Sequence, residues 1–261
     1  MKKRWNLGGA VGIAGLIAIL VFFAALWDGF NGNPVSVAVS TAKIKDYVAR
    51  TYPDQELAVE RAFRDFKRGG YSCLVRSPSS QDTFFTVSIN GERFTDSYEF
   101  QVTRRNNTRE RLESELHGLV TAAVEDSFPY ETQLVGAELI MDEEESTPAD
   151  WLLDMPFDLE NLPEPVGVRV WTCTDRPDYQ TLALRLLELR ALLEKAGIYP
   201  DFYSMTLEMP YGEDGRPVSF DASAQVEYFP SQQLTDDSGL TQRILRFQGG
   251  QRAVDAHLLP S

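Results

Sequence analysis

The chain carries 25 Lys and Arg residues against 39 Asp and Glu residues over 261 positions, a formal net charge of −14. An acidic chain repels nucleic acids and anionic lipid surfaces, so the charge argues against both as partners. The length suffices for one large or two small domains with proper hydrophobic cores, and stability therefore needs neither a disulfide framework nor a structural metal. The two cysteines agree with this conclusion.

The segment from Leu7 to Trp27 is uncharged and apolar over 21 residues. A helix of this length rises by roughly 30 Å, about the thickness of the hydrocarbon layer of a bilayer. Three basic residues at positions 2–4 precede it, so the positive-inside rule predicts a single-pass plasma-membrane protein with a cytoplasmic N-terminus and everything after Asp28 outside the cell. A cleaved signal peptide is the alternative, but bulky residues stand where a cleavage site needs small ones.

The first domain is expected over residues 37–130, after a Gly/Asn/Pro-rich tether over residues 29–36. Near its start, Ile44, Tyr47 and Val48 are spaced as on one face of a short amphipathic helix. This helix would pack on the strands that follow it.

Strand-like alternation predicts an antiparallel meander in this domain, over Leu57–Phe66, Tyr71–Arg76 and Thr83–Ile89. The Asn90-Gly91 pair favours a type I′ hairpin into a further strand over Arg93–Tyr98. Asn107 to Glu110 matches a capping box, which predicts the start of a helix with one face on the meander.

The second domain is expected over residues 134–248, followed by a disordered tail over residues 249–261. Its pattern predicts a strand over Ala137–Met141, an acidic surface loop over residues 142–165 and a second strand over Val166–Cys173. A helix over Tyr179–Ala196, a hairpin of Tyr203–Met209 with Phe220–Tyr228 and a short helix over Leu240–Phe247 are expected to follow. The chain is therefore expected to be α+β, with a transmembrane helix in residues 1–28 and then two small domains, each an antiparallel sheet packed by helices.

The acidic loop over residues 142–165 holds nine acidic residues and four prolines but no basic residue. Its apolar residues indicate that part of it docks, either on its own domain or on a partner. The helix over Tyr179–Ala196 has leucines on both sides, which points to apolar neighbours on both faces. These two features predict a candidate interaction surface of Trp151, Leu152, Leu153, Phe157, Leu184, Leu187 and Ala191.

Reactive motifs are scarce, and each is better explained without chemistry. Ser40 to Lys43 fits the SxxK pattern of serine acyl-transfer enzymes, but no companion motif follows. Cys73 lies on the apolar side of its strand, whereas Cys173 faces the other way in its own strand. This difference argues against a disulfide between them, and the pairing is left open. We therefore predict no catalytic residues, no cofactor and no metal site, and a protein that is not an enzyme.

Two stretches of the chain resemble a known family. YSCLVRSPSSQDTFFTVSINGERFTDSY from Tyr71 to Tyr98, and FDLENLPEPVGVRVW, DYQTLALRLLELRALLEKAGI and FYSMTLEMP between Phe157 and Pro210, are similar to the YfjL-like proteins of Gram-positive bacteria. The resemblance implies a single-span envelope protein with two small α+β domains, and it carries no catalytic residues. The layout of the first domain also resembles the PepSY modules, which are linked to peptidase inhibition.

From the residues and this resemblance together, the expected function is a non-catalytic binding or interaction module at the cell envelope. Its partner would be an envelope protein or a second copy of the chain, the latter through Leu184 and Leu187. The alternatives are a peptidase inhibitor of the PepSY type and a cell-wall-directed enzyme, which would show a deep polar pocket with converging carboxylates or hydroxyls.

Overall fold

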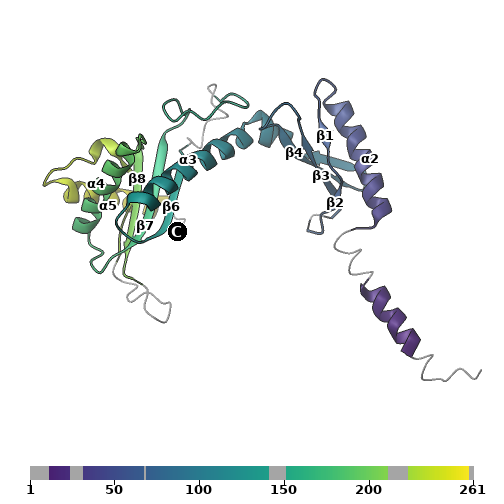
Figure 1. Cartoon of the computed structure of the whole chain (residues 1–261), viewed down its shortest axis with the longest axis horizontal. Helices are drawn as coiled ribbons and strands as arrows, with labels where there is room; N and C mark the ends of the chain where they lie inside the picture. Colours follow the sequence, from purple (N-terminus) through teal and green to yellow (C-terminus); the bar gives the residue numbers. More distant parts are fainter. Residues whose placement is uncertain (1–11, 24–31, 68, 141–150, 211–222, 259–261) are drawn as a thin grey trace, which may run out of the picture. The chain divides into compact units, whose positions relative to one another are not determined.

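The computed structural model describes residues 12–23, 32–67, 69–140, 151–210 and 223–258, with side chains described as far as residue 250. It divides into two compact units (Figure 1). The first unit comprises Met1–Thr108 with Leu152–Asp154, and the second comprises Arg109–Trp151 with Met155–Ser261. Each unit has its own sheet and its own hydrophobic core, and the predicted α+β class is confirmed.

The predicted membrane-spanning helix is contradicted. Within the segment from Leu7 to Trp27 the described helical part covers residues 12–23, while Leu7 and Trp27 themselves lie outside the described residues. Twelve residues rise by about 18 Å, well short of the roughly 30 Å of a hydrocarbon layer. None of the described helices is long and apolar enough to cross a membrane. This finding contradicts the prediction of a single-pass plasma-membrane protein, because the residues described as helical are too few to cross the layer.

The sheet of the first unit is antiparallel, in the order β1-β3-β4-β5, with β2 also paired to β3. Its strands are β1 (Ala58–Val59), β2 (Phe63–Arg64), β3 (Tyr71–Arg76), β4 (Phe84–Asn90) and β5 (Arg93–Asp96). Alternation places the buried apolar side chains of the two central strands on one face, namely Cys73, Val75, Phe85, Val87 and Ile89. The predicted meander is therefore present, except that the strand expected over Leu57–Phe66 consists of two short strands, β1 and β2, which both pair with β3.

The β4–β5 hairpin differs from the predicted type I′ turn. Asn90 pairs with Arg93, so the two loop residues are Gly91 and Glu92. Gly91 has φ 63°, whereas Glu92 is not among the residues with positive φ. A positive φ at the first loop position alone is the pattern of a type II′ turn, in which glycine occupies that position.

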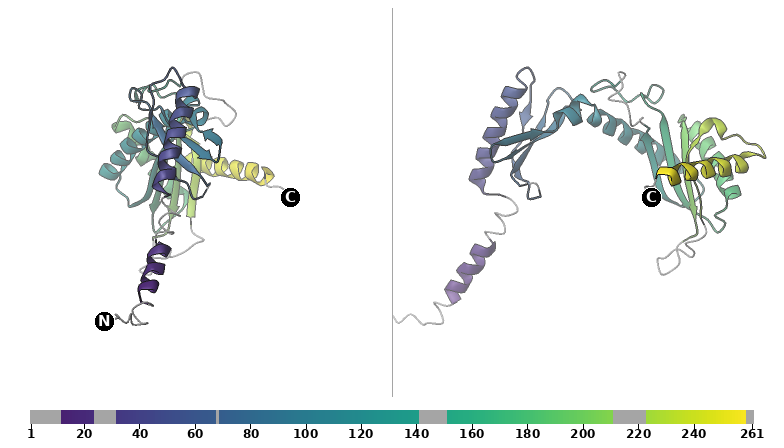
Figure 2. Two further views of the ribbon diagram at one scale, coloured as in Figure 1. Left: turned by 90° about the vertical axis from the view of Figure 1, so that its right-hand side faces the viewer. Right: turned by 180° about the vertical axis from the view of Figure 1, so that it is seen from behind.

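Helix α2 (Pro34–Thr51) lies across one face of this sheet (Figure 2). The Asn33 side chain accepts a hydrogen bond from the Val35 N–H and caps the helix, and Pro34 occupies its first turn. The helix therefore begins inside the segment that we predicted to be a tether. Its buried face consists of Val37, Ser40, Ile44 and Val48, which recur at helical spacing.

A π-helical turn η1 (Glu99–Thr103) leads into α3 (Asn106–Ser127). We placed this helix in the first domain, with residues 37–130, but the two units divide after Thr108. The physical reason is its buried stripe of Leu112, Leu116, Val120 and Val124, which belongs to the core of the second unit.

The sheet of the second unit has the order β6-β7-β8-β9. Its strands are β6 (Thr132–Leu139), β7 (Val166–Cys173), β8 (Phe202–Glu208) and β9 (Ser223–Pro230). The prediction that this sheet is antiparallel was wrong, since β7 and β8 are parallel. Helix α4 (Tyr179–Lys195) joins these two strands and carries the chain back to the starting edge, as a parallel pair requires.

Helices α3, α4 and α5 supply the helical side of the second core. Val168 and Val170 of β7 and Met205 of β8 meet the buried leucines of α4 in one continuous cluster. After the short turn η2 (Ser231–Gln233), α5 (Leu240–Leu258) packs against β9 and α4, as Figure 2 also shows. Helix α5 continues through Gly249 and Gly250, where we expected a disordered tail.

Candidate functional site

The loop residues of the predicted interaction surface are not gathered on one surface. The Trp151 side chain is buried in the core of the second unit and donates its Nε1–H to Glu164 Oε1 at 3.1 Å. Leu153 packs against the core of the first unit, and Phe157 packs against that of the second. Leu152 is 65% exposed. The acidic run at residues 142–145 lies outside the described residues.

The helix residues of that surface are divided in the same way. Leu184 is 58% exposed and Ala191, seven positions later on the same face of α4, is also exposed. Leu187 is half-buried and packs against the core of the second unit. The outer face of α4 thus presents one large apolar side chain rather than a continuous apolar stripe.

Arg185 is the most buried charged side chain of the second unit's described part, at 7% exposure. Its Nη1 donates to Thr172 Oγ1 at 3.0 Å and to the Cys173 carbonyl at 2.9 Å, and its guanidinium lies 3.8 Å from the centre of the Tyr130 ring. Burial lowers the pKa of Arg185. These contacts join α4 to the end of β7 and leave the group no open face toward a ligand, so its role is structural.

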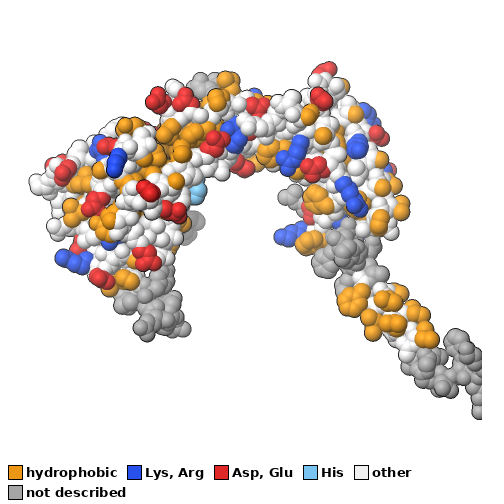
Figure 3. Space-filling model, viewed as in Figure 1, with side chains coloured by type: hydrophobic (Ala, Val, Ile, Leu, Met, Phe, Trp, Pro, Cys, Tyr) orange, Lys and Arg blue, Asp and Glu red, His pale blue; other side chains and the backbone are white. Residues whose placement is uncertain are grey.

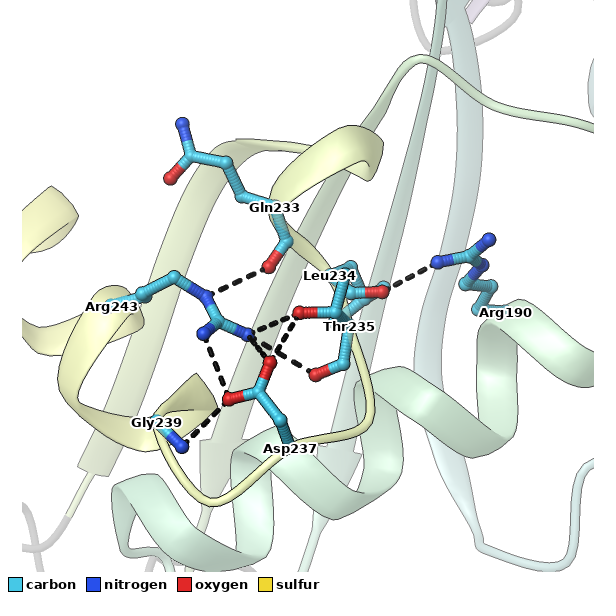
Figure 4. Close-up of polar contacts among 7 residues, drawn as sticks. All are labelled: Arg190, Gln233, Leu234, Thr235, Asp237, Gly239 and Arg243. Carbon is cyan, nitrogen blue, oxygen red and sulfur yellow. Dashed lines mark hydrogen bonds and ion pairs between the residues drawn. The ribbon is translucent and has the colours of Figure 1, made fainter.

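A second polar cluster lies in the loop before α5, shown in Figure 4. Arg243 Nη1 and Nη2 each lie 2.9 Å from a carboxylate oxygen of Asp237, and Arg243 Nε donates to the Gln233 carbonyl. The Asp237 carboxylate also accepts from the Gly239 N–H. Hydrogen bonds from Arg243 and Thr235 hold the pKa of Asp237 far below its usual range. The cluster closes the loop on itself and orders the start of α5.

A group of tyrosines surrounds Asp96 in the first unit. The Tyr47 hydroxyl donates to Asp96 Oδ2 at 2.5 Å, and the Tyr47 ring stacks on Phe94 with 4.7 Å between centroids. Burial, together with Asp96, raises the pKa of both Tyr47 and Tyr52. Hydroxyls with raised pKa stay protonated and donate hydrogen bonds, so this group fastens α2 to β5 rather than supplying a base or nucleophile.

The two cysteines are free thiols, and the disulfide that the sequence left open is not formed. Burial raises the pKa of the Cys73 thiol to about 11 and also raises that of Cys173. A thiol with a raised pKa is a poor nucleophile at neutral pH. Within the described ranges no group of three His, Cys, Asp or Glu side chains is placed to hold a metal ion.

The outer face of α2 is an exposed apolar surface of the first unit. Over its first turns the face away from the sheet carries Val35, Ala38, Val39 and Ala42, and no charged residue. Val35 is 70% exposed and Val39 is 49% exposed. A surface helix normally turns polar residues outward, and one that is apolar all round is normally covered. We call these four residues the α2 outer face.

One flank of the α2 outer face is hollowed by a groove of about 420 Å³, which we call the Lys45 groove. Its lining is Pro34, Val37, Ala38, Thr41, Ala42, Lys45 and Arg61. Thr41 ties this flank together, since its hydroxyl donates to the Val37 carbonyl at 2.8 Å and accepts from the Ala62 N–H at 3.0 Å. That bond holds the residue next to Arg61 against α2. A further hollow of about 550 Å³ continues from Lys45 toward Tyr52.

The other flank bears a groove of about 310 Å³, which we call the Lys43 groove. It lies between α2 and the sheet, with Val35, Val39, Ser40 and Lys43 on one side and Tyr71 and Ile89 among the residues on the other. The SxxK pair therefore shares a groove, but Ser40 is on the buried face of the helix. Gly70 has φ 95°, and a side chain there would clash with the Ile89 carbonyl, so glycine is required for this close approach of backbone to backbone.

The sequence analysis did not identify the residues that line the two grooves beside α2. The signal was present, because no charged residue occurs between Asp28 and Lys43. We assigned the start of this stretch to a tether, and so the apolar residues were not placed on a helix. Figure 3 shows apolar side chains interspersed with both basic and acidic ones on the visible face of the first unit.

Two family models match the chain. One is described as YfjL-like, N-terminal domain, and matches residues 10–103; the other is described as YfjL-like C-terminal domain, and matches residues 115–244. The first match includes α2 and the whole first sheet, and the second includes most of α3, all four strands of the second sheet and α4. No curated protein and no solved structure matches the chain. Since the two models together cover most of its length, the chain belongs to the YfjL-like family.

Proposed function

We propose that the protein is a non-catalytic binding module whose first unit holds a polypeptide partner against the α2 outer face. The observation that carries the proposal is the exposure of Val35 and Val39 on a helix whose other face is already packed on the sheet. Burying both valines in a complex contributes roughly 2 kcal/mol. A free energy of this size supports only weak, reversible association. The complex therefore needs additional contacts along the grooves.

The shape of the site supports binding of an extended or helical segment rather than capture of a small substrate. The hollows beside α2 are shallow surface grooves with walls of apolar, hydroxyl and basic side chains, and they follow the helix from Pro34 to Tyr52. Peptide-binding proteins use such grooves for the side chains of a segment that lies along them. The polar clusters of Arg185, Arg243 and Asp96 are each satisfied by neighbouring groups of the protein itself.

The test is an in-cell crosslink and pull-down with the full chain and a C-terminal tag, in cells that make the protein. The V35S/V39S variant removes the apolar character of the α2 outer face. The matched control, L152S/L184S, removes two leucines of similar exposure that belong to the surface predicted from the sequence. We expect V35S/V39S to lose the partner that the wild type recovers, and L152S/L184S to retain it.

The opposite pattern, loss with L152S/L184S and retention with V35S/V39S, would move the binding surface to the loop and α4. Recovery of no partner by the wild type would contradict a binding function. Circular dichroism of both variants checks that neither has unfolded, and the exposed positions make unfolding unexpected because surface substitutions rarely cost more than about 0.5 kcal/mol.

A further inference from the structure

We infer that the partner segment is acidic as well as apolar: its apolar side chains cover Val35 and Val39, and its carboxylates reach Lys45 and Arg61 on one flank and Lys43 on the other. This inference rests on the proposed function and names the chemistry of the ligand. The two parts are separable by experiment, because apolar contact and charge can be removed independently.

The linings of the two grooves carry positive charge only. Lys45 and Arg61 line the Lys45 groove, Lys43 lines the Lys43 groove, and the described residues of the two linings include no aspartate or glutamate. Thr41 fixes the spacing on the first flank, because its bond to the Ala62 N–H holds the chain beside Arg61 close to the helix turn that carries Lys45. Two cations therefore line the same hollow, Lys45 from α2 and Arg61 from the loop between β1 and β2.

Among the residues that the structure describes, these three cations have no carboxylate partner at ion-pair distance. None of the ion pairs found among the described residues involves Lys43, Lys45 or Arg61. The nearby Glu60 is already paired with Arg76 at 3.0 Å. Asp46, the next acidic residue of α2, is not part of either lining. A carboxylate in the groove would thus meet free ammonium and guanidinium groups, and an arginine binds a carboxylate with two parallel hydrogen bonds.

The charges of the two units point the same way. The first unit contains 14 basic and 11 acidic residues, a net charge of +3, whereas the second contains 11 basic and 28 acidic residues, a net charge of −17. The overall acidity that argued against anionic partners is therefore a property of the second unit alone. The three basic residues at positions 2–4 account for the whole excess of the first unit, so the net charges show only that the second unit repels an acidic segment. The cations of the groove linings, and not the net charge of the first unit, favour α2.

The probe is a fluorescein-labelled short peptide of alternating leucine and glutamate, titrated with the full chain and followed by fluorescence anisotropy. Its counterparts carry glutamine or lysine in place of glutamate. We expect the glutamate peptide to bind, the K45Q/R61Q variant to bind it about tenfold more weakly, and added salt to weaken binding. The matched control K67Q/R93Q removes two cations of the same unit that line neither α2 groove.

Equal loss in K67Q/R93Q would show unspecific attraction to the first unit and would overturn the inference, as would equal binding of the glutamine peptide or no binding of the glutamate peptide. Stronger binding of anionic phosphatidylglycerol vesicles than of the glutamate peptide, lost in K45Q/R61Q, would assign the cations to a lipid headgroup instead. If these tests fail while V35S/V39S still loses the partner in cells, the proposed function stands and only the acidic character of the ligand is wrong.

Discussion

Single side chains in this protein owe their roles to partners that are distant in sequence. Asn107 matches a capping box in the sequence, yet its side-chain amide donates to the Asp82 carbonyl at 2.8 Å and to the Phe84 carbonyl at 2.6 Å. It is 2% exposed and fixes the start of β4 to the start of α3. Capping propensity correctly indicated a helix start nearby but could not show which acceptors the amide would find.

Replacing Asn107 with alanine tests this role. The change removes two hydrogen bonds and leaves two carbonyls without these donors, which should lower the free energy of unfolding of the first unit by about 2 kcal/mol. Hydrogen exchange of the β3 and β4 amides, followed by mass spectrometry, measures the loss. Asn106→Ala is the control, because its amide makes one exposed bond to the Phe100 carbonyl and should cost less than about 1 kcal/mol. Equal effects of the two variants would contradict the assignment.

At the scale of elements, the helix ends show how far local rules reach. The structure places α4 within the predicted range Tyr179–Ala196 and shows what ends it on each side: Asp178 Oδ1 accepts from the Thr181 N–H at 2.7 Å, and Gly197 has φ 77°. The start of α2 follows the same rules, with Asn33 as its cap and Pro34 next to it. We missed it because the apolar residues after Pro34 face both the core and the outside, and so show no amphipathic pattern.

The cap of α4 makes a pH-dependent prediction. The Thr181 N–H holds the pKa of Asp178 below its ordinary value of 3.8. A carboxylate whose pKa is lower in the folded than in the unfolded state stabilises the folded protein. This contribution is complete at a pH above the pKa of the unfolded state, and it is lost as the pH falls through the pKa of the folded state. Asp178→Ala should therefore cost about 1 kcal/mol at neutral pH, and less as the pH falls below 3.8.

Urea unfolding of the full chain at a series of pH values, with hydrogen exchange of α4 as the readout, measures this difference. Asp178→Asn is the matched control, because its amide oxygen still caps the helix but does not titrate. The gap between wild type and Asp178→Asn should close below pH 3.8, and a gap that stays constant with pH would contradict the titration of Asp178 as its cause.

At the scale of the whole molecule, two separate cores organise the chain. Val87 belongs to the core of the first unit and Leu186 to that of the second, and both side chains are fully buried. The short run Leu152–Asp154 is counted with the first unit although its neighbours on both sides belong to the second. The sequence placed all of it in one loop of one domain.

Core substitutions should therefore act on one unit at a time. Val87→Ala should destabilise the first unit by about 2 kcal/mol and Leu186→Ala the second by about 3 kcal/mol, because each leaves a cavity in a packed core. Hydrogen exchange resolved by peptide reports both units in one sample. In the double variant the two losses should add within about 0.5 kcal/mol. Loss of protection in both units from either single change would show that the cores unfold as one.

The sequence by itself determined the features that depend on neighbours along the chain. The bounds of β7, the range of α4 and the inward faces of β3 and β4 all follow from local patterns, which act over a few residues. Only the tertiary structure decided the parallel pairing of β7 with β8 and the division of the chain after Thr108. It also decided that Trp151 packs in the second core and Leu153 in the first, and that Val35 and Val39 are exposed. These features depend on which elements pack together. A sequence does not distinguish an apolar residue that is covered by another part of the chain from one that stays exposed and can be covered only by a partner.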